Sequence, residues 1–259
     1  MPTVDRGGWR LGYEVAGDGP ETVVLTHGLG ATGAAWRAQV DALAGRYRVV
    51  TWDLRAHGRS DAPDAPCDVA ALGADLIAVT GAAGGGAAHL VGFSAGGVLA
   101  MRAALDAPGF VRSLVLVGTS SECNAAARDR YESLAATAAR AGGAAVLAAL
   151  GVRAAAAAPP DGRGFARVAR AIGAMHGAPL TGELARIRCP ALVLVGERDP
   201  LGAGGSVIIA RALAARPGVP TRLEILPGLR HAVFRDDPAL FNRLVADFLS
   251  STTTNTPRA

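Results

Sequence analysis

The most informative segment of the sequence is residues 89–106, which read HLVGFSAGGVLAMRAALD. The apolar run His89–Phe93 predicts a buried strand, and residues 97–106 predict a helix. Between them, residues 92–96 have the GxSxG spacing of a sharp strand-to-helix turn, which holds its central serine above the sheet. The alternative is an ordinary glycine-rich turn. The strand and helix on either side favour Ser94 as an exposed nucleophile.

Apolar runs rich in β-branched residues recur along the chain and alternate with helical patterns such as residues 69–79 and 240–249. Further strands are expected at Thr22–Thr26, Arg48–Trp52, Ser113–Val117, Ala191–Val195 and Thr221–Leu226. Trp9–Val15 alternates in hydropathy, which predicts an antiparallel edge strand. Apolar strands that alternate with helices indicate an α/β fold, with a mostly parallel central sheet flanked by helices.

The alternation stops between residues 120 and 184, where no strand is expected. Asn124–Arg140 and Gly143–Leu150 predict two helices, and the prolines and glycines of residues 151–164 predict a break. A third helix follows, with an apolar face made by Phe165, Val168, Ile172 and Met175. We therefore expect a core at 1–119 and 185–250, a small helical cap or lid at 120–184, and a disordered polar tail at 251–259.

Composition and charge exclude several classes of protein. Half of the 259 residues are hydrophobic and no apolar run reaches the roughly 18 residues of a membrane span, which predicts a globular, cytoplasmic protein with no membrane partner. All 26 basic residues are arginine, but they are interleaved with acidic residues, so no nucleic-acid partner is expected. The three cysteines lack metal-type spacing and are expected as free thiols. We expect a monomer or homodimer with no metal and no organic cofactor.

A serine nucleophile needs a base, and a histidine base is oriented by a carboxylate. His231 follows the last predicted strand, and Asp199 directly follows the strand at 191–195, so both are expected at the same edge of the sheet as Ser94. Glu122 is an alternative acid because it follows another strand. Asp236 and Asp237 are expected to cap the final helix, and Glu197 to be solvated or in a loop salt bridge. Of the other histidines, His27 and His57 lie in HG pairs of early loops, which favours a role in stabilising turns, whereas His89 begins a strand and His176 ends a helix of the insertion.

Stabilising a tetrahedral intermediate requires two donors to its oxyanion. The backbone N–H of Ala95, directly after the nucleophile, is the first candidate. The second is the N–H of Leu29, in the loop His27-Gly-Leu-Gly30 after an early strand. Residues that could line a substrate pocket, each with ordinary packing as the alternative, are Gly28, Trp36, Phe93, Tyr131 and Met175.

Five motifs, in this order along residues 22–250, carry a resemblance to a known superfamily. They are HGLG (27–30) followed by Trp36, DLRAHGRS (53–60), GFSAG (92–96), GERDP (196–200) and LRH (229–231). The sequence resembles the α/β-hydrolase superfamily, and is most similar to 3-oxoadipate enol-lactonase-like proteins and small esterases. Ala56 stands where that superfamily usually has glycine. The resemblance implies the α/β-hydrolase fold and a Ser-His-Asp triad.

On this basis we expect a serine hydrolase that cleaves a small-molecule carboxylic ester or lactone through an acyl-enzyme. One alternative uses the same triad for C–C bond hydrolysis, a lyase step or a cyclisation in metabolism. Another is a ligand-binding signalling protein on the same fold. Substrate choice is expected to depend on the cap, whose arginines either form a solvated face or include one that binds a substrate carboxylate. These arginines are Arg128, Arg130, Arg140, Arg153, Arg163, Arg167 and Arg170.

Overall fold

The computed structural model describes residues 2–84, 86–151 and 159–253. Within these ranges, one eight-stranded sheet has the strand order β1-β2-β4-β3-β5-β6-β7-β8. The strands are β1 Thr3–Asp5, β2 Arg10–Ala16, β3 Thr22–Thr26, β4 Arg48–Trp52, β5 Ala88–Phe93, β6 Val111–Val117, β7 Ala191–Gly196 and β8 Thr221–Leu226. From β4 to β8 across the sheet all pairs are parallel, which confirms the expected α/β class.

One strand prediction needs correction. The segment expected as an antiparallel edge strand is β2, and it does pair antiparallel with β4. It is not the edge, because β1 pairs with its outer side. With only three residues, β1 is too short for a period-two pattern to be recognised.

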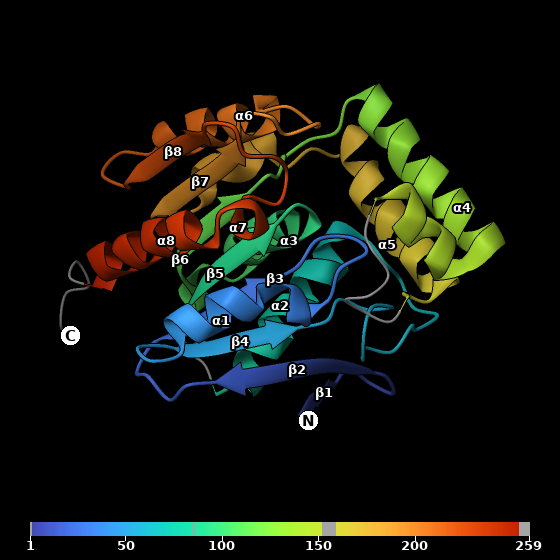
Figure 1. Cartoon of the computed structure of the whole chain (residues 1–259), viewed down its shortest axis with the longest axis horizontal. Coiled ribbons are helices and arrows are strands. Elements are labelled where there is room, and N and C mark those ends of the chain that lie inside the picture. The colour runs from blue at the N-terminus through green and yellow to red at the C-terminus, as the bar shows by residue number, and fades with distance from the viewer. Residues whose placement is uncertain (1, 85, 152–158, 254–259) are drawn as a thin grey trace.

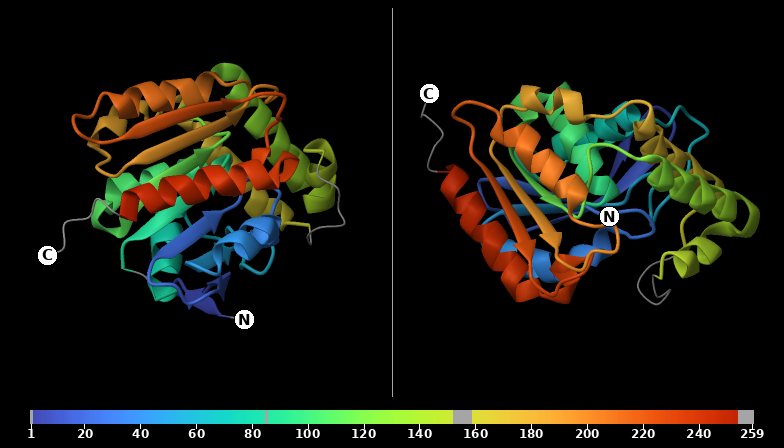
Figure 2. Two further views of the ribbon diagram at one scale, coloured as in Figure 1. Left: turned by 60° about the vertical axis from the view of Figure 1, so that its left-hand side comes forward. Right: turned by 90° about the horizontal axis from the view of Figure 1, so that it is seen from above.

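Helices cover both faces of the sheet (Figures 1 and 2). One face carries α1 (Arg37–Leu43), the short α7 (Val233–Asp236) and α8 (Pro238–Thr253), whose apolar residues share a cluster with Val23, Leu25 and Val91. The other face carries α2 (Val69–Ala82), α3 (Ala95–Asp106) and α6 (Gly204–Ala214). Because the sheet is buried on both sides, its strands are continuously apolar. Polar residues that could act on a ligand are therefore expected in the loops at the strand ends.

The helical insertion lies beyond the carboxyl ends of the parallel strands (Figure 1). It contains α4 (Ala125–Ala149) and α5 (Gly162–Gly173), followed by the short 3₁₀ helices at Ala174–His176 and Thr181–Arg186. Gly142, with φ of 78° and ψ of 178°, interrupts α4 and separates the two helices expected there. We call residues 120–184 the cap.

The expected break at 151–164 extends too far, because α5 already begins at Gly162. Asp161 caps this helix, since its carboxylate accepts the Gly164 N–H at 2.7 Å. A cap of this kind stabilises a first turn that contains two glycines. Residues 152–158, including Arg153, lie outside the described residues.

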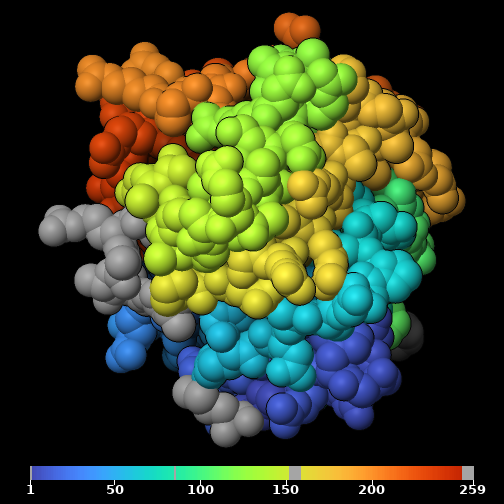
Figure 3. All heavy atoms as spheres, turned by 90° about the vertical axis from the view of Figure 1, so that its right-hand side faces the viewer, coloured from blue at the N-terminus to red at the C-terminus, as the bar shows by residue number. Residues whose placement is uncertain are grey.

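The cap is held to the core by a turn at residues 53–66 (Figure 3). Arg167 of α5 donates to the Pro63 carbonyl at 2.7 Å and pairs with Asp64 at 2.6 Å. The Asp161 N–H donates to the carbonyl of Ala56 at 2.9 Å. Ala56 has φ of 66°, in the left-handed region that favours glycine, so a position at which glycine was expected has a backbone conformation suited to glycine although its side chain is a methyl group.

The C-terminal tail was expected to be disordered from residue 251. Helix α8 continues instead to Thr253, so three of these residues are helical. Ser251 and Thr252 donate their hydroxyls to the carbonyls of Phe248 and Leu249 in this last turn. Residues 254–259 lie outside the described part of the chain.

Candidate active site

Ser94 lies at the turn between β5 and α3, with φ of 52° and ψ of −118°. A left-handed φ in a residue that is not glycine is uncommon and costs about 1–2 kcal/mol. The neighbouring glycines make this turn possible, because a Cβ on Gly92 would press on the carbonyl oxygen of Gly96, and a Cβ on Gly96 would press on that of Thr26. The chain therefore has the tight strand-to-helix geometry that was expected at the GxSxG motif.

Two hydrogen bonds fix the backbone of this strained residue. The Ser94 N–H donates to the Val117 carbonyl at 2.9 Å, which continues the pairing of β5 with β6. The Thr119 hydroxyl donates to the Ser94 carbonyl at 2.7 Å. A Cβ on Gly97 would lie 2.6 Å from the Thr119 methyl, so the close approach of these two segments depends on glycine there. Strain of this kind persists only where the surroundings hold it, and here they do.

Asp199 and His231 form a hydrogen-bonded pair at the same edge of the sheet. His231 Nδ1 lies 2.7 Å from Asp199 Oδ2. The carboxylate side chain is 1% exposed and the imidazole 25% exposed, so the acid is shielded while the ring reaches solvent. The other carboxylate oxygen, Oδ1, accepts the Leu201 N–H at 2.8 Å. With both oxygens engaged, the carboxylate orients the ring with Nδ1 protonated and Nε2 free to accept a proton.

The ring of His231 also borders the turn at Ser94. It lies 4.7 Å, centroid to centroid, from the ring of Phe93, the residue directly before Ser94. A Cβ on Gly118 would lie 3.1 Å from His231 Nδ1, so the glycine after β6 leaves room for the ring. Ser94 Oγ is not hydrogen bonded to any residue that the structure describes. Hydrogen bonds between nucleophile and base are often long before substrate binds.

The rival acids have other partners. Glu122 Oε2 accepts the Thr181 hydroxyl at 2.6 Å, within the cap. Asp237 accepts the Leu240 N–H at 2.9 Å and caps α8 as expected. Asp236 does not cap that helix but accepts the Arg230 N–H at 2.7 Å. Glu197, expected to be solvated or in a salt bridge, accepts the Gly228 N–H at 2.9 Å. Of these acids, Asp199 is the one that contacts His231.

The candidate oxyanion loop, His27–Gly30, packs against Ser94. A Cβ on Gly28 would lie 3.0 Å from the Cβ of Ser94 and 3.1 Å from the Phe93 ring. The Gly28 carbonyl points away, because it accepts from the His27 ring at 2.7 Å. The peptide is trans, so the Leu29 N–H points to the opposite side. Neither this N–H nor that of Ala95 is bonded to a described residue, which leaves both able to donate to a ligand.

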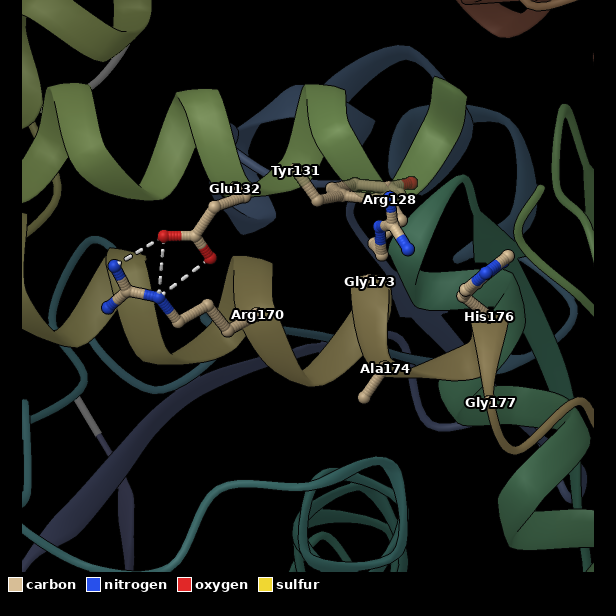
Figure 4. Close-up of a pocket in the computed structure, with 8 residues that line it drawn as sticks. All are labelled: Arg128, Tyr131, Glu132, Arg170, Gly173, Ala174, His176 and Gly177. Atoms are coloured by element: carbon tan, nitrogen blue, oxygen red, sulfur yellow. Dashed lines mark hydrogen bonds and ion pairs between the residues drawn. The ribbon is translucent and has the colours of Figure 1, made fainter. Parts of the chain in front are cut away.

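The other proposed substrate contacts are distributed differently. Gly28 and Phe93 adjoin Ser94, as the distances above show. Trp36 is 0% exposed and stacks on Phe234 at 4.1 Å, and Met175 is 2% exposed, which favours core packing for both. Tyr131 borders a cavity of about 310 Å³ between α4 and the end of α5 (Figure 4). Its lining residues are Arg128, Tyr131, Glu132, Arg170, Gly173, Ala174, His176 and Gly177. This cavity lies within the cap and is separate from Ser94.

None of the described arginines of the cap is buried, and three of them are paired with acids. Arg170 pairs with Glu132 at 2.8 Å and Arg128 with Asp129 at 2.8 Å, and both pairs are exposed. Arg167 binds the core turn, as described above. Arg130, Arg140 and Arg163 are exposed. Leu29 packs instead against an apolar cluster of the cap, whose members are Leu134, Ala135, Ala138, Val146, Phe165, Ala166 and Ala169.

No group of three or more His, Cys, Asp or Glu side chains among the described residues could hold a metal ion. The cysteines are free, and burial raises the pKa of Cys123 to about 11 and that of Cys189 to about 12. Neutral thiols of this kind are poor nucleophiles. No helix in the described ranges has the length and apolar character needed to cross a membrane.

Comparison with known proteins places this geometry in a family. A family model described as "Alpha/beta hydrolase family" matches residues 23–244. The putative carbamate hydrolase RutD of Azorhizobium caulinodans is 38% identical over 117 residues, which are 45% of this chain and 44% of that protein. The chain thus matches less than half the length of this curated relative.

Solved structures match over almost the whole chain. A hydrolase from Pseudomonas aeruginosa PA01 is 29% identical, with a TM-score of 0.83 over 96% of this chain and 97% of that one. An enol-lactonase from Burkholderia xenovorans LB400 is 23% identical, with a TM-score of 0.83 over 96% and 100% of the two chains. At that identity the second likeness concerns the fold alone.

Proposed function

The chain belongs to the alpha/beta hydrolase family, and from that premise we propose that it cleaves carboxylic esters or lactones through an acyl-enzyme on Ser94. The observation that carries this proposal is the Asp199–His231 hydrogen bond of 2.7 Å beside the strained turn of Ser94. A nucleophile, a base and an acid that orients the base are the minimum set for acyl transfer.

In the first half of the reaction, His231 Nε2 takes the proton from Ser94 Oγ as the oxygen attacks the substrate carbonyl carbon. Asp199 holds the ring in the tautomer whose Nε2 is free and stabilises the imidazolium that forms. The oxyanion accepts the N–H groups of Leu29 and Ala95, each worth about 3 kcal/mol in the transition state. His231 then protonates the leaving oxygen as the C–O bond breaks.

In the second half, His231 removes a proton from water, and the resulting nucleophile attacks the acyl carbon. The tetrahedral intermediate collapses, the Ser94 Oγ–acyl bond breaks, and His231 returns the proton to Ser94. The carboxylic acid leaves. A lactone follows the same steps, except that its leaving oxygen stays attached to the acyl chain.

The apolar cap residues around Leu29 support an uncharged, apolar substrate. The described cap arginines are exposed or engaged with Glu132, Asp129 and the turn at Pro63–Asp64, so they do not favour recognition of a carboxylate on the substrate. Burial of an unpaired carboxylate among the apolar side chains would cost several kcal/mol. We therefore favour simple esters and uncharged lactones over an enol-lactone acid.

A matched pair of substrates tests this function. p-Nitrophenyl butyrate and mono-p-nitrophenyl succinate have acyl chains of similar length, but only the second carries a carboxylate. We expect turnover of the butyrate with a kcat/KM at least about tenfold higher than that of the succinate, corresponding to about 1.4 kcal/mol. Preference for the succinate would refute the proposed preference for uncharged, apolar substrates. Labelling of Ser94 without turnover of any ester or lactone would favour C–C cleavage or ligand binding by the same triad.

A further inference from the structure

Two histidines outside the triad flank the oxyanion loop. His27 is the first residue of that loop, and His57 lies in the turn after β4. Both are fully shielded, with 0% and 1% of their surface exposed, and their ring centroids are 5.4 Å apart. Their sequence context suggested a role in stabilising turns. Their four ring nitrogens indicate a more specific one.

His27 binds the carbonyl side of the peptide that carries the candidate oxyanion donor. Its Nδ1 lies 2.7 Å from the Gly28 carbonyl oxygen, which can only accept, so Nδ1 carries the proton. Its Nε2 accepts the Leu54 N–H at 3.0 Å, which fixes the ring. The Ala31 N–H also donates to this carbonyl, at 3.2 Å. Because the carbonyl and the following N–H point in opposite directions across a trans peptide, these two bonds together set the direction of the Leu29 N–H.

His57 binds the other side of Leu29. Its Nδ1 donates to the Arg55 carbonyl at 3.0 Å, and its Nε2 accepts the Gly30 N–H at 3.1 Å. Both rings thus need the same neutral tautomer, with the proton on Nδ1. The residue between the two bonded peptides is Leu29.

We propose that His27 and His57 are positioning residues that hold the Leu29 N–H in place for the oxyanion from both sides. The inference rests on the proposed function and deepens it, because it assigns to these residues the geometry of the oxyanion hole. Neither ring touches the reacting atoms. Small displacements of an oxyanion donor are costly because its distance to the developing charge must stay near 2.7–3.1 Å.

The surroundings keep both rings neutral. Burial lowers the pKa of His27 to about 3, and it also lowers that of His57. The charged groups that act on the rings are Asp53, which favours protonation of both, and Arg235, which disfavours protonation of His27. Asp53 is itself engaged, accepting the N–H groups of Gly33 at 2.7 Å and Arg59 at 3.0 Å. On the cap side, the apolar ring of Phe165 lies 5.6 Å from that of His57.

Paired substitutions separate positioning from packing. His57→Gln retains an oxygen that can accept the Gly30 N–H, whereas His57→Leu removes the acceptor. His27→Asn retains a donor for the Gly28 carbonyl, whereas His27→Leu removes it. With p-nitrophenyl butyrate, we expect kcat to fall about 10–100-fold in each Leu variant, since losing a donor outright costs about 10²–10³-fold. KM should change little, and the Gln and Asn variants should recover most of the rate.

His89→Leu is the matched control. His89 is 1% exposed and bonds Ser113 at 2.8 Å where β5 begins, at the opposite end of that strand from Ser94. The His89→Leu variant should lower the melting temperature as much as His27→Leu and His57→Leu do, and it should leave kcat unchanged. Equal kcat in wild type and the His27 and His57 Leu variants would overturn the inference. So would a loss of rate that tracks melting temperature across all three Leu variants.

A second measurement is independent of activity. An N–H···N hydrogen bond transmits a scalar coupling, so we expect coupling between the Gly30 amide nitrogen and His57 Nε2 in ¹⁵N-labelled protein. Its absence in well-resolved spectra at pH 7 would overturn the inference. If the wild type neither hydrolyses esters nor is labelled at Ser94, the proposed function fails, and with it the catalytic role of the two histidines. An active wild type with unimpaired Leu variants refutes this inference alone.

Discussion

Replacing Asp199 by asparagine tests the orientation of the base. In the structure, Oδ1 accepts the Leu201 N–H and Oδ2 accepts from His231 Nδ1. Asparagine can supply only one acceptor. If its oxygen keeps the bond to Leu201, its NH₂ group faces Nδ1 of His231. The ring then has to carry its proton on Nε2, and a protonated Nε2 can no longer accept the proton of Ser94.

The size of the effect follows from this change of tautomer. A comparable substitution in a Ser-His-Asp triad lowers kcat about 10⁴-fold. At 1.36 kcal/mol per tenfold change, the barrier rises by about 5 kcal/mol. Asparagine has nearly the same shape as aspartate, so the melting temperature should change little. The assay is hydrolysis of p-nitrophenyl butyrate by purified wild type and Asp199→Asn, with thermal unfolding measured on the same samples.

The rival acids provide controls. Glu122→Gln removes a charge bonded to Thr181, and Asp236→Asn removes one bonded to Arg230. Both should retain the kcat of the wild type. If Asp199→Asn kept activity within tenfold of the wild type, or if Glu122→Gln were the more damaged variant, our assignment of the acid would be wrong.

Two further predictions concern stability. Because burial lowers the pKa of His27 and His57 below the ordinary value of 6.5, the unfolded chain binds more protons than the folded one in acid. The contribution of these two neutral rings to the free energy of unfolding should therefore be complete above pH 6.5. The free energy of unfolding, measured with urea, should decline as the pH falls from 6.5 toward 3. The double variant His27→Asn/His57→Gln should show a smaller decline, and an equal one would contradict the assignment. Asp75→Asn removes the negative charge that the buried guanidinium of Arg55 contacts at 2.7 Å and should lower the free energy of unfolding by about 3–5 kcal/mol. Asp41→Asn, in an exposed pair, should change it by less than about 1 kcal/mol, and equal losses in urea unfolding would count against this reasoning.

The parallel strands could be predicted from the sequence because they are buried on both faces. All five residues of β3 are buried, and such strands read as unbroken apolar runs. The start of α5 could not be predicted in the same way. Glycine propensity argued against a helix at Gly162 and Gly164, but the Asp161 cap and the contact of Gly164 with Ala56 outweigh it.

The candidate site shows a similar division. The motifs around Ser94, Asp199 and His231 lie at strand ends, so the fold alone predicts that they share one edge of the sheet. From the sequence, Trp36 could be a core residue or a residue that lines the substrate pocket, because its stacking partner Phe234 is distant in sequence. The role of His57 was equally hidden, since the groups its ring binds are backbone atoms that carry no sequence signal.

Labelling with a serine-directed phosphonate, followed by mass spectrometry of the peptides, tests the central claim most directly. We predict stoichiometric modification of wild type at Ser94 together with complete loss of p-nitrophenyl butyrate hydrolysis. Ser94→Ala should neither be labelled nor hydrolyse the ester, with its fold unchanged by circular dichroism. An unlabelled Ser94, or an alanine variant as active as the wild type, would contradict the claim that Ser94 is the nucleophile.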